Sequence, residues 1–309
     1  MPCHVDDILW TGTEEFKKGV INKLKETFVM GTTGSEAFEY VGIELKQNAD
    51  MSIVLSQTSY ADTLQPIEIS PGRKSEKSAP LTKSEKTELR GAIGQLNWMS
   101  CTSRPDISYE VSIASSNIKE ASINDLLHIN KVIKKVKQEK SWVTFPGLDM
   151  NSLHIRSFAD ASYNSLKKGG SQGGHVIFLA DKYNRCCPIE WKSNRLTRVV
   201  RSPLAAETLA CTDCVESDIF LARALKEILK KEISIVHFTD SQSLLDNLKS
   251  KKTVSDKLLR VDINLMKESM ERNHVEVKWI EGESNLSDIM TKAGVNSKLL
   301  LDTLRYGSF

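Results

Sequence analysis

Residues 153–180 read LHIRSFADASYNSLKKGGSQGGHVIFLA and contain two apolar runs of strand length, 153–159 and 175–180. A third apolar run follows at 188–192. The spacing predicts three consecutive strands that pair as an antiparallel meander. Glycines punctuate what we interpret as its first turn: Gly169, Gly170, Gly173 and Gly174.

After this meander the sequence alternates helix and strand signals. Ser202 and Pro203 form a strong helix start, because serine caps a helix and proline loses no hydrogen bond at the first helical position. This helix should run to about Lys230. The further elements expected are a strand at 233–238, helices at 241–248 and 256–272, a strand at 275–280 and a final helix from about Leu286. Such alternation is typical of an α/β fold.

The first 150 residues follow a different pattern. Apolar residues recur every four positions over 14–28, which predicts a helix, and residues 38–55 favour a β-hairpin. Residues 68–79 lack periodicity and are rich in Ser, Lys and Glu, so we expect an exposed connection there. Three helices should follow, at 83–99, 107–118 and 123–140.

The composition is that of a globular protein. The chain has 309 residues, enough for two domains, and its net charge of +2 comes from 42 basic and 40 acidic side chains. Nucleic-acid binding would therefore need local patches. The last predicted helix of the first half offers one basic stretch, for which a solvated face and a phosphate contact both remain open: Lys131, Lys134, Lys135, Lys137 and Lys140.

Neither a membrane segment nor a signal peptide is expected, since acids occupy the N-terminus where a signal peptide carries basic residues. The six cysteines lack a spaced framework, which favours a reducing cytoplasmic or nuclear setting over secretion. Cys211 and Cys214 lie one helical turn apart. A zinc site there would need two further ligands, and none is evident in the sequence.

Four acidic residues stand at the ends of predicted elements or within apolar runs: Asp160, Glu207, Asp240 and Asp288. The predicted strand order brings their elements together. Taken singly, Asp240 could cap the helix that starts at Ser241, and Asp288 could interact with the dipole of a helix from its first turn. Jointly, buried like charges require a counter-charge, and two divalent cations would supply it for phosphodiester cleavage.

Several segments resemble the ribonuclease H domain of copia-type retrotransposon polyproteins: SFADASY, EWKSNR, RSPLAAETLA, FTDSQSLL and NLSDIMTK. The resemblance covers nearly all of residues 150–295 and implies an RNase H-like mixed five-stranded sheet with flanking helices. It implies that the four acids bind two Mg²⁺ ions, with Mn²⁺ as an alternative, and cut the RNA strand of an RNA–DNA hybrid. Residues that would contact the nucleic acid are Ser162, Asn164, Ser241 and Gln242.

The first half resembles the end of a copia-type reverse transcriptase. CHVDDILWTG is similar to the palm hairpin, which would make Asp6 and Asp7 its acids, and residues 55–64 and 81–112 resemble the end of the palm, the thumb and the connection. We therefore expect a partial reverse transcriptase of mixed α+β structure at 1–148 and an RNase H-like domain at 149–309. Fingers, most of the palm and the upstream aspartate are absent, so polymerase activity is not expected from this chain alone.

Three hypotheses follow. The preferred one is a retroelement ribonuclease H that acts on RNA–DNA hybrids, with other retroelement proteins as candidate partners and no membrane association. The alternative is a catalytically inactive relic, or an adopted module, that binds nucleic acid. A third, less favoured, restores polymerase function when another chain supplies the missing domains.

Overall fold

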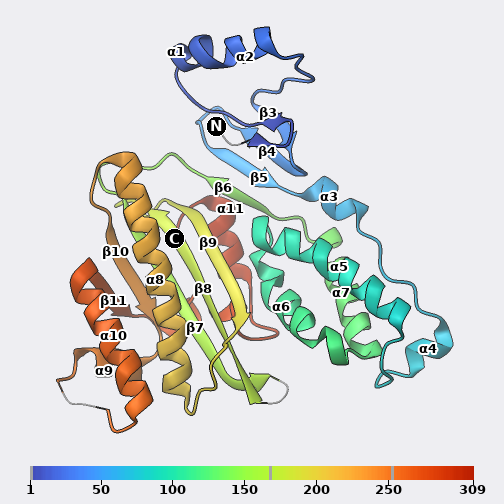
Figure 1. Ribbon diagram of the computed structural model, residues 1–309, viewed down its shortest axis with the longest axis vertical. Coiled ribbons are helices and arrows are strands. Elements are labelled where there is room, and N and C mark those ends of the chain that lie inside the picture. The colour runs from blue at the N-terminus through green and yellow to red at the C-terminus, as the bar shows by residue number, and fades with distance from the viewer. Residues whose placement is uncertain (1–2, 167–168, 252–253) are drawn as a thin grey trace.

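A computed structural model of the protein describes residues 3–166, 169–251 and 254–309. It contains a five-stranded sheet flanked by helices, beside which lie a helical bundle and a small antiparallel sheet (Figure 1). None of the helices in these ranges combines the length and apolar character that a bilayer-spanning segment needs.

Short elements make up the N-terminal segment. The strands β1 (Cys3–His4) and β2 (Asp7–Ile8) form a hairpin that turns at Val5 and Asp6. The helix expected at 14–28 is confirmed, although a π-helical turn interrupts it. Its parts are α1 (Glu14–Phe16), the π-helical turn Lys17–Ile21 and α2 (Asn22–Thr27).

A four-stranded antiparallel sheet follows, and its last strand comes from much later in the chain. Its members, in spatial order, are β3 (Ala37–Tyr40), β4 (Ile43–Gln47), β5 (Ile53–Ser56) and β6 (Trp142–Phe145). The expected pairing of this region with residues 53–55 is confirmed by β4 and β5, but the single strand expected at 38–45 was wrong, because a turn at Val41 and Gly42 divides it into β3 and β4. Because β6 follows the helical bundle in sequence, the sheet joins the chain before and after that bundle.

The bundle's helices are α3 (Thr58–Thr63), α4 (Pro71–Ser75), α5 (Lys83–Thr102), the 3-10 turn Pro105–Ile107, α6 (Ser108–Asn117), the 3-10 turn Ile118–Glu120 and α7 (Ile123–Gln138). A reciprocal capping box between Thr82 and Glu85 begins α5. Fully buried side chains such as Leu96 and Ile133 form its core. The expectation of an irregular connection at 68–79 was wrong in part, since Ser70 caps α4 inside it.

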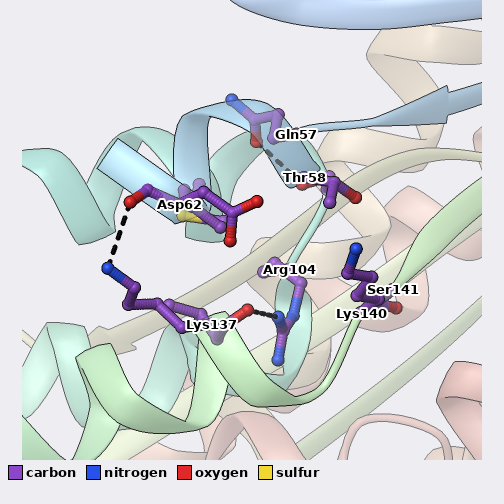
Figure 2. Close-up of a pocket in the computed structure, with 11 residues that line it drawn as sticks. Gln57, Thr58, Asp62, Arg104, Lys137, Lys140 and Ser141 are labelled. Atoms are coloured by element: carbon purple, nitrogen blue, oxygen red, sulfur yellow. Dashed lines mark hydrogen bonds between the residues drawn. The ribbon is translucent and has the colours of Figure 1, made fainter. Parts of the chain in front are cut away.

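A buried charge pair lies at the turn between α5 and α6. Arg104 donates to both carboxylate oxygens of Asp106, at 2.8 and 2.9 Å, and Lys135 Nζ lies 3.1 Å from the same group. Figure 2 shows Arg104 in the pocket between α3 and α7, where Lys137 donates to the backbone oxygen of Asp62 at 3.0 Å. These cations therefore tie α7 to its neighbours.

The larger sheet consists of β7 (His154–Leu166), β8 (Gly170–Ala180), β9 (Cys186–Arg195), β10 (Ser234–Thr239) and β11 (Val275–Trp279). Its order is β11-β10-β7-β8-β9. The first three strands in sequence pair antiparallel, whereas β10 runs parallel to both β7 and β11. The predicted meander and the predicted mixed five-stranded sheet are confirmed.

Helices cover both faces of this sheet (Figure 1). They are α8 (Pro203–Leu229), α9 (Gln242–Lys249), α10 (Lys257–Asn273) and α11 (Lys298–Tyr306). On one face Ile155 and Ile177 pack with residues of α8. On the other face Phe158 and Phe178 pack with Leu300 of α11. Alternate residues of each strand thus enter two separate cores.

Three of the four glycines assigned to the first turn belong to a strand instead. Gly170, Gly173 and Gly174 lie in β8, and Gly174 pairs with Asp160 of β7. A Cβ atom on Gly174 would contact the Cβ of Met290 and lie 3.1 Å from Cγ2 of Thr291. Glycine is therefore needed at this position because another segment approaches the sheet closely.

The last helix begins later than expected. Instead of a helix from about Leu286, the chain forms two 3-10 turns, Gly282–Ser284 and Asp288–Met290, and α11 begins only at Lys298. Asp288 therefore starts a single turn rather than the final helix.

The two halves of the chain are in contact. The helix α6 lies against β9, and the indole nitrogen of Trp191 donates to the backbone oxygen of Ser100 at 2.6 Å. A domain boundary after residue 148 stays a prediction.

Candidate metal centre

Three aspartates predicted from the sequence meet at one end of the large sheet. Asp160 belongs to β7, Asp240 directly follows β10, and Asp288 begins the 3-10 turn. Because β7 and β10 are parallel neighbours, their carboxyl ends lie at the same edge. One carboxylate oxygen from each aspartate lies within 4.8 Å of the other two.

Glu207 joins this group from α8. It accepts a hydrogen bond from the backbone of Ala161, next to Asp160, and its Oε2 atom is buried with no hydrogen-bond partner among the described residues. Burial, together with the charges of Asp160 and Asp240, raises the pKa of Glu207 to about 9. All four predicted acids are therefore brought together, and we call this group the acidic centre.

Two residues that the sequence reasoning did not single out complete the centre. Thr291 donates a hydrogen bond to Asp160, and Lys292 forms ion pairs with Asp160, at 3.4 Å, and with Asp288. The signal was present in the sequence, since Asp288 and Lys292 lie four residues apart in SDIMTK.

A third such residue is Asn285. Its side-chain amide donates to the backbone oxygen of Ala159 at 3.1 Å, which holds the 3-10 turns against β7. Asn285 is buried, and its side chain also hydrogen-bonds Asp240. This residue thus positions both the turn and one of the acids.

The electrostatics of the centre are those of a cation-binding site. Burial raises the pKa of Asp160 to about 6 against the opposing effect of Lys292, and burial likewise raises the pKa of Asp240. Among the residues that the structure describes, Lys292 is the cation that the four carboxyl groups share, so negative charge remains in excess. An all-oxygen carboxylate set with an unpartnered buried oxygen fits a hard divalent cation such as Mg²⁺.

The predicted nucleic-acid contacts are partly engaged within the protein. Ser162 donates to the backbone oxygen of Thr291 at 2.9 Å, while Ser241 caps α9 and Gln242 donates to Asp246 at 2.8 Å. Asn164 is exposed, with a positive φ of 52°, on the irregular stretch of β7. Their contact with nucleic acid stays a prediction.

Asp6 and Asp7 lie elsewhere. Both are exposed in the β1–β2 hairpin. Neither belongs to a group of three metal-ligating side chains in the described residues. The hairpin geometry agrees with the sequence prediction, but the structure brings no third acid to it within the described ranges.

The amino-acid sequence of the chain is similar to those of several known proteins. No family model matches the chain. An uncharacterized mitochondrial protein of Arabidopsis thaliana is 28% identical over 219 residues, which are 66% of this chain and 86% of that protein. A putative transposon Ty5-1 protein of Saccharomyces cerevisiae is 25% identical over 226 residues, or 69% of this chain and 71% of that protein.

A match along most of the chain is to the retrovirus-related Pol polyprotein from transposon TNT 1-94 of Nicotiana tabacum. It is 24% identical over 323 aligned residues, 96% of this chain, and the chain spans 23% of the polyprotein's length. Among solved structures, LC11-RNase H1 in complex with an RNA/DNA hybrid has a TM-score of 0.36 at 14% identity, covering 44% of this chain and 93% of that chain. Foamy viral protease-reverse transcriptase in complex with an RNA/DNA hybrid has a TM-score of 0.45 at 13% identity, covering 84% and 31%.

The sequence relatives and the strand order of the large sheet agree with each other. The large sheet has the mixed order expected of a ribonuclease H fold, and the relatives that align along the chain derive from transposons. The homologues of this chain include retrotransposon Pol polyproteins, and it is similar to a fragment of a copia-type Pol polyprotein.

Proposed function

We propose that the chain is a metal-dependent ribonuclease H that cleaves the RNA strand of RNA–DNA hybrids. The observation that carries the proposal is the convergence of Asp160, Glu207, Asp240 and Asp288 from four separate elements. Their retroelement relatives supply the biological context.

Each residue has a distinct task in this proposal. Asp160 and Asp240 would hold divalent cations, with Glu207 and Asp288 as further ligands. Such ions would supply a reactive water and stabilisation of the leaving oxygen of a phosphodiester. Thr291 fixes the orientation of Asp160, since it donates to its carboxylate, whereas Lys292 neutralises part of the negative charge of the acids. Mg²⁺ is the proposed ion, with Mn²⁺ as an alternative.

Cleavage of a hybrid tests the proposal. The purified chain is incubated with Mg²⁺ and a hybrid whose RNA strand is end-labelled, and we expect RNA cleavage that EDTA abolishes. Asp160→Asn should lower the rate on the order of a thousandfold, as expected for loss of a charge-stabilising group. Asp62→Asn, on the exposed side of α3, is the control and should retain the wild-type rate. Absence of cleavage, or equal rates in both variants, contradicts the proposal.

One observation favours a second candidate, a module that binds nucleic acid without cleaving it. A groove over α7 and the segment before α5 is lined by lysines: Lys74, Lys77, Lys131, Lys134 and Lys137. Binding of the same labelled hybrid in EDTA, together with no cleavage in Mg²⁺, would support this second function. Replacing Lys131 and Lys134 by Gln should weaken that binding and reduce its dependence on salt.

A further inference from the structure

A second group of metal-ligating side chains lies on the α8 face of the same sheet. Cys214 and Asp218 are four residues apart on one side of α8, and His237 projects from β10 toward them. One ligand atom from each lies within 4.8 Å of the other two. All three side chains are fully buried, with no exposed surface on any of them.

The hydrogen bonds within this group leave two polar atoms unsatisfied. Ser157 of β7 donates to Asp218 Oδ2 at 2.5 Å, and its hydroxyl lies 2.9 Å from His237 Nδ1. Asp218 Oδ1 and His237 Nε2 are buried and have no hydrogen-bond partner among the described residues. The atoms that face the Ser157 hydroxyl are Asp218 Oδ2 and His237 Nδ1, which lie 3.9 Å apart, so a cation that also binds the serine oxygen would be held through these two atoms.

The chemistry of the donors selects the kind of ligand. A thiol, an imidazole and a carboxylate are the sulfur, nitrogen and oxygen donors that Zn²⁺ binds in proteins, whereas Mg²⁺ prefers oxygen alone. Cys214 and Asp218 would each release a proton on binding. Two anionic ligands and one neutral imidazole then balance the two positive charges of the ion, so the filled site is neutral. Neutrality matters here because an uncompensated charge at a fully buried site is costly.

We propose that Cys214, Asp218 and His237 bind a single Zn²⁺ ion that joins α8 to β10, with the Ser157 hydroxyl as the fourth donor. The site is closed to solvent, so the ion is structural and does not take part in hydrolysis. It is separate from the acidic centre. Ser157 and His237 each precede an acid of that centre by three residues, which directs their side chains to the opposite face of the strand.

In this arrangement only one of the two cysteines of α8, Cys214, is a proposed zinc ligand. Cys211 and Cys214 are close in sequence, but Cys211 lies one helical turn nearer the acidic centre. There it hydrogen-bonds Thr239, and burial and the charge of Glu207 raise the pKa of its thiol. The missing ligands for Cys214 come instead from the next turn of α8 and from a strand more than twenty residues later. Cys211 therefore provides a matched control, since both thiols are fully buried on the same helix.

Metal analysis of the full chain tests the inference. The protein is purified from zinc-supplemented medium, dialysed without chelator, and its zinc measured by mass spectrometry. We expect a single zinc ion per chain in the wild type and in Cys211→Ser, and roughly tenfold less or lower still in Cys214→Ser. A wild type without zinc, or a Cys214→Ser variant with as much zinc as Cys211→Ser, would overturn the proposal.

Cobalt spectroscopy separates this site from the acidic centre, and its main measurement uses the wild-type protein alone. Stripped wild-type protein is titrated with Co²⁺, and a sulfur-to-cobalt charge-transfer band should appear, because the acidic centre contains no sulfur ligand. His237→Gln should lose the tetrahedral visible bands while circular dichroism confirms its fold. A wild-type spectrum that lacks the charge-transfer band contradicts the site outright.

Discussion

Asp106 in the helical bundle and Asp160 in the large sheet are equally buried, each with 1% of its surface exposed, yet their pKa values move in opposite directions. Burial alone would raise the pKa of Asp106, but Arg104 and Lys135 outweigh it and hold that pKa below its ordinary value. Around Asp160 burial dominates, and Lys292 is shared with other acids, so its pKa rises to about 6.

The difference separates two uses of a buried carboxylate. Asp106 has its counter-charges within the protein and serves to hold a turn against α7. Asp160 belongs to a cluster whose negative charge exceeds the charge of the lysine beside it. A cluster of that kind is stabilised by an external cation, which is why the sheet site and not the bundle site is the candidate for chemistry.

The largest effect should come from breaking the compensated pair. Arg104→Ala leaves Asp106 buried beside Lys135 alone, and we expect a loss of about 3–5 kcal/mol in the free energy of unfolding at neutral pH, measured with urea. Arg198→Ala removes an exposed partner of Asp262 and should cost less than about 1 kcal/mol. Equal losses in the two variants would remove the distinction between buried and exposed pairs.

A backbone change tests how closely the acidic centre must be packed. Gly174→Ala places a methyl group against Met290 and Thr291, and overpacking of this kind should destabilise the protein by about 1–3 kcal/mol in urea unfolding. Gly94→Ala, in α5 with no atom near its added methyl group, should instead stabilise by about 0.5–1 kcal/mol. Tolerance of the Gly174 change would mean that the 3-10 turn can move away from the sheet.

The two aspartates should give opposite pH dependence in metal-free buffer. The folded-state pKa of Asp106 is lowered from 3.8, so its contribution is present above about pH 4 and is lost as pH falls below that value. Asp160, raised from 3.8 to about 6, keeps its proton longer in the folded state, so stability falls as pH rises between those values. Urea unfolding from pH 3 to 7 in EDTA checks this, with a slope of at most about 1.4 kcal/mol per pH unit for each group.

Variants assign the two limbs of that pH profile. Asp106→Asn should abolish the loss on the acidic limb. Asp160→Asn should make the decline between pH 4 and 6 shallower without removing it, because the raised pKa values of Glu207 and Asp240 contribute to the same decline. A profile in which both variants change the same limb would show that the two sites are not electrostatically opposite.

The smallest expected effect concerns the lysine shared by the acids. Lys292→Gln leaves the centre more negative, so a lower Mg²⁺ concentration should half-saturate hybrid cleavage, by roughly fivefold or about 1 kcal/mol. Lys182→Gln, which removes an exposed pair with Asp149, is the control and should leave the Mg²⁺ requirement unchanged. An increased requirement would mean that Lys292 supports cation binding and does not compete with it.

Much of the fold could be predicted because its signals are local. Apolar runs marked the strands, the serine and proline at the start of α8 marked that helix, and the order of elements placed four acids at one sheet edge. Contacts between segments that are distant in sequence could not be predicted in this way. Thr291 reaches Asp160 across 131 residues, and the need for glycine at Gly174 depends on that approach rather than on a turn.

The remaining errors have the same origin. The apolar residues after Leu286 resemble a helix start, but tertiary contacts hold them in 3-10 turns, with Asn285 bonded to β7. The partners of Cys214 were missed because His237 belongs to another element, and sequence spacing alone cannot show which strand lies under α8.

The contact between α6 and β9 has a consequence for expressing the two halves of the chain separately. β9 is an outer strand of the large sheet, and α6 lies against it. Trp191 of β9 donates to Ser100 of α5, and Gln172 of the adjacent β8 donates to Ser112 of α6. An uncovered outer strand favours pairing with a neighbouring molecule. We therefore expect residues 149–309, expressed without the helical bundle, to associate with one another through β9.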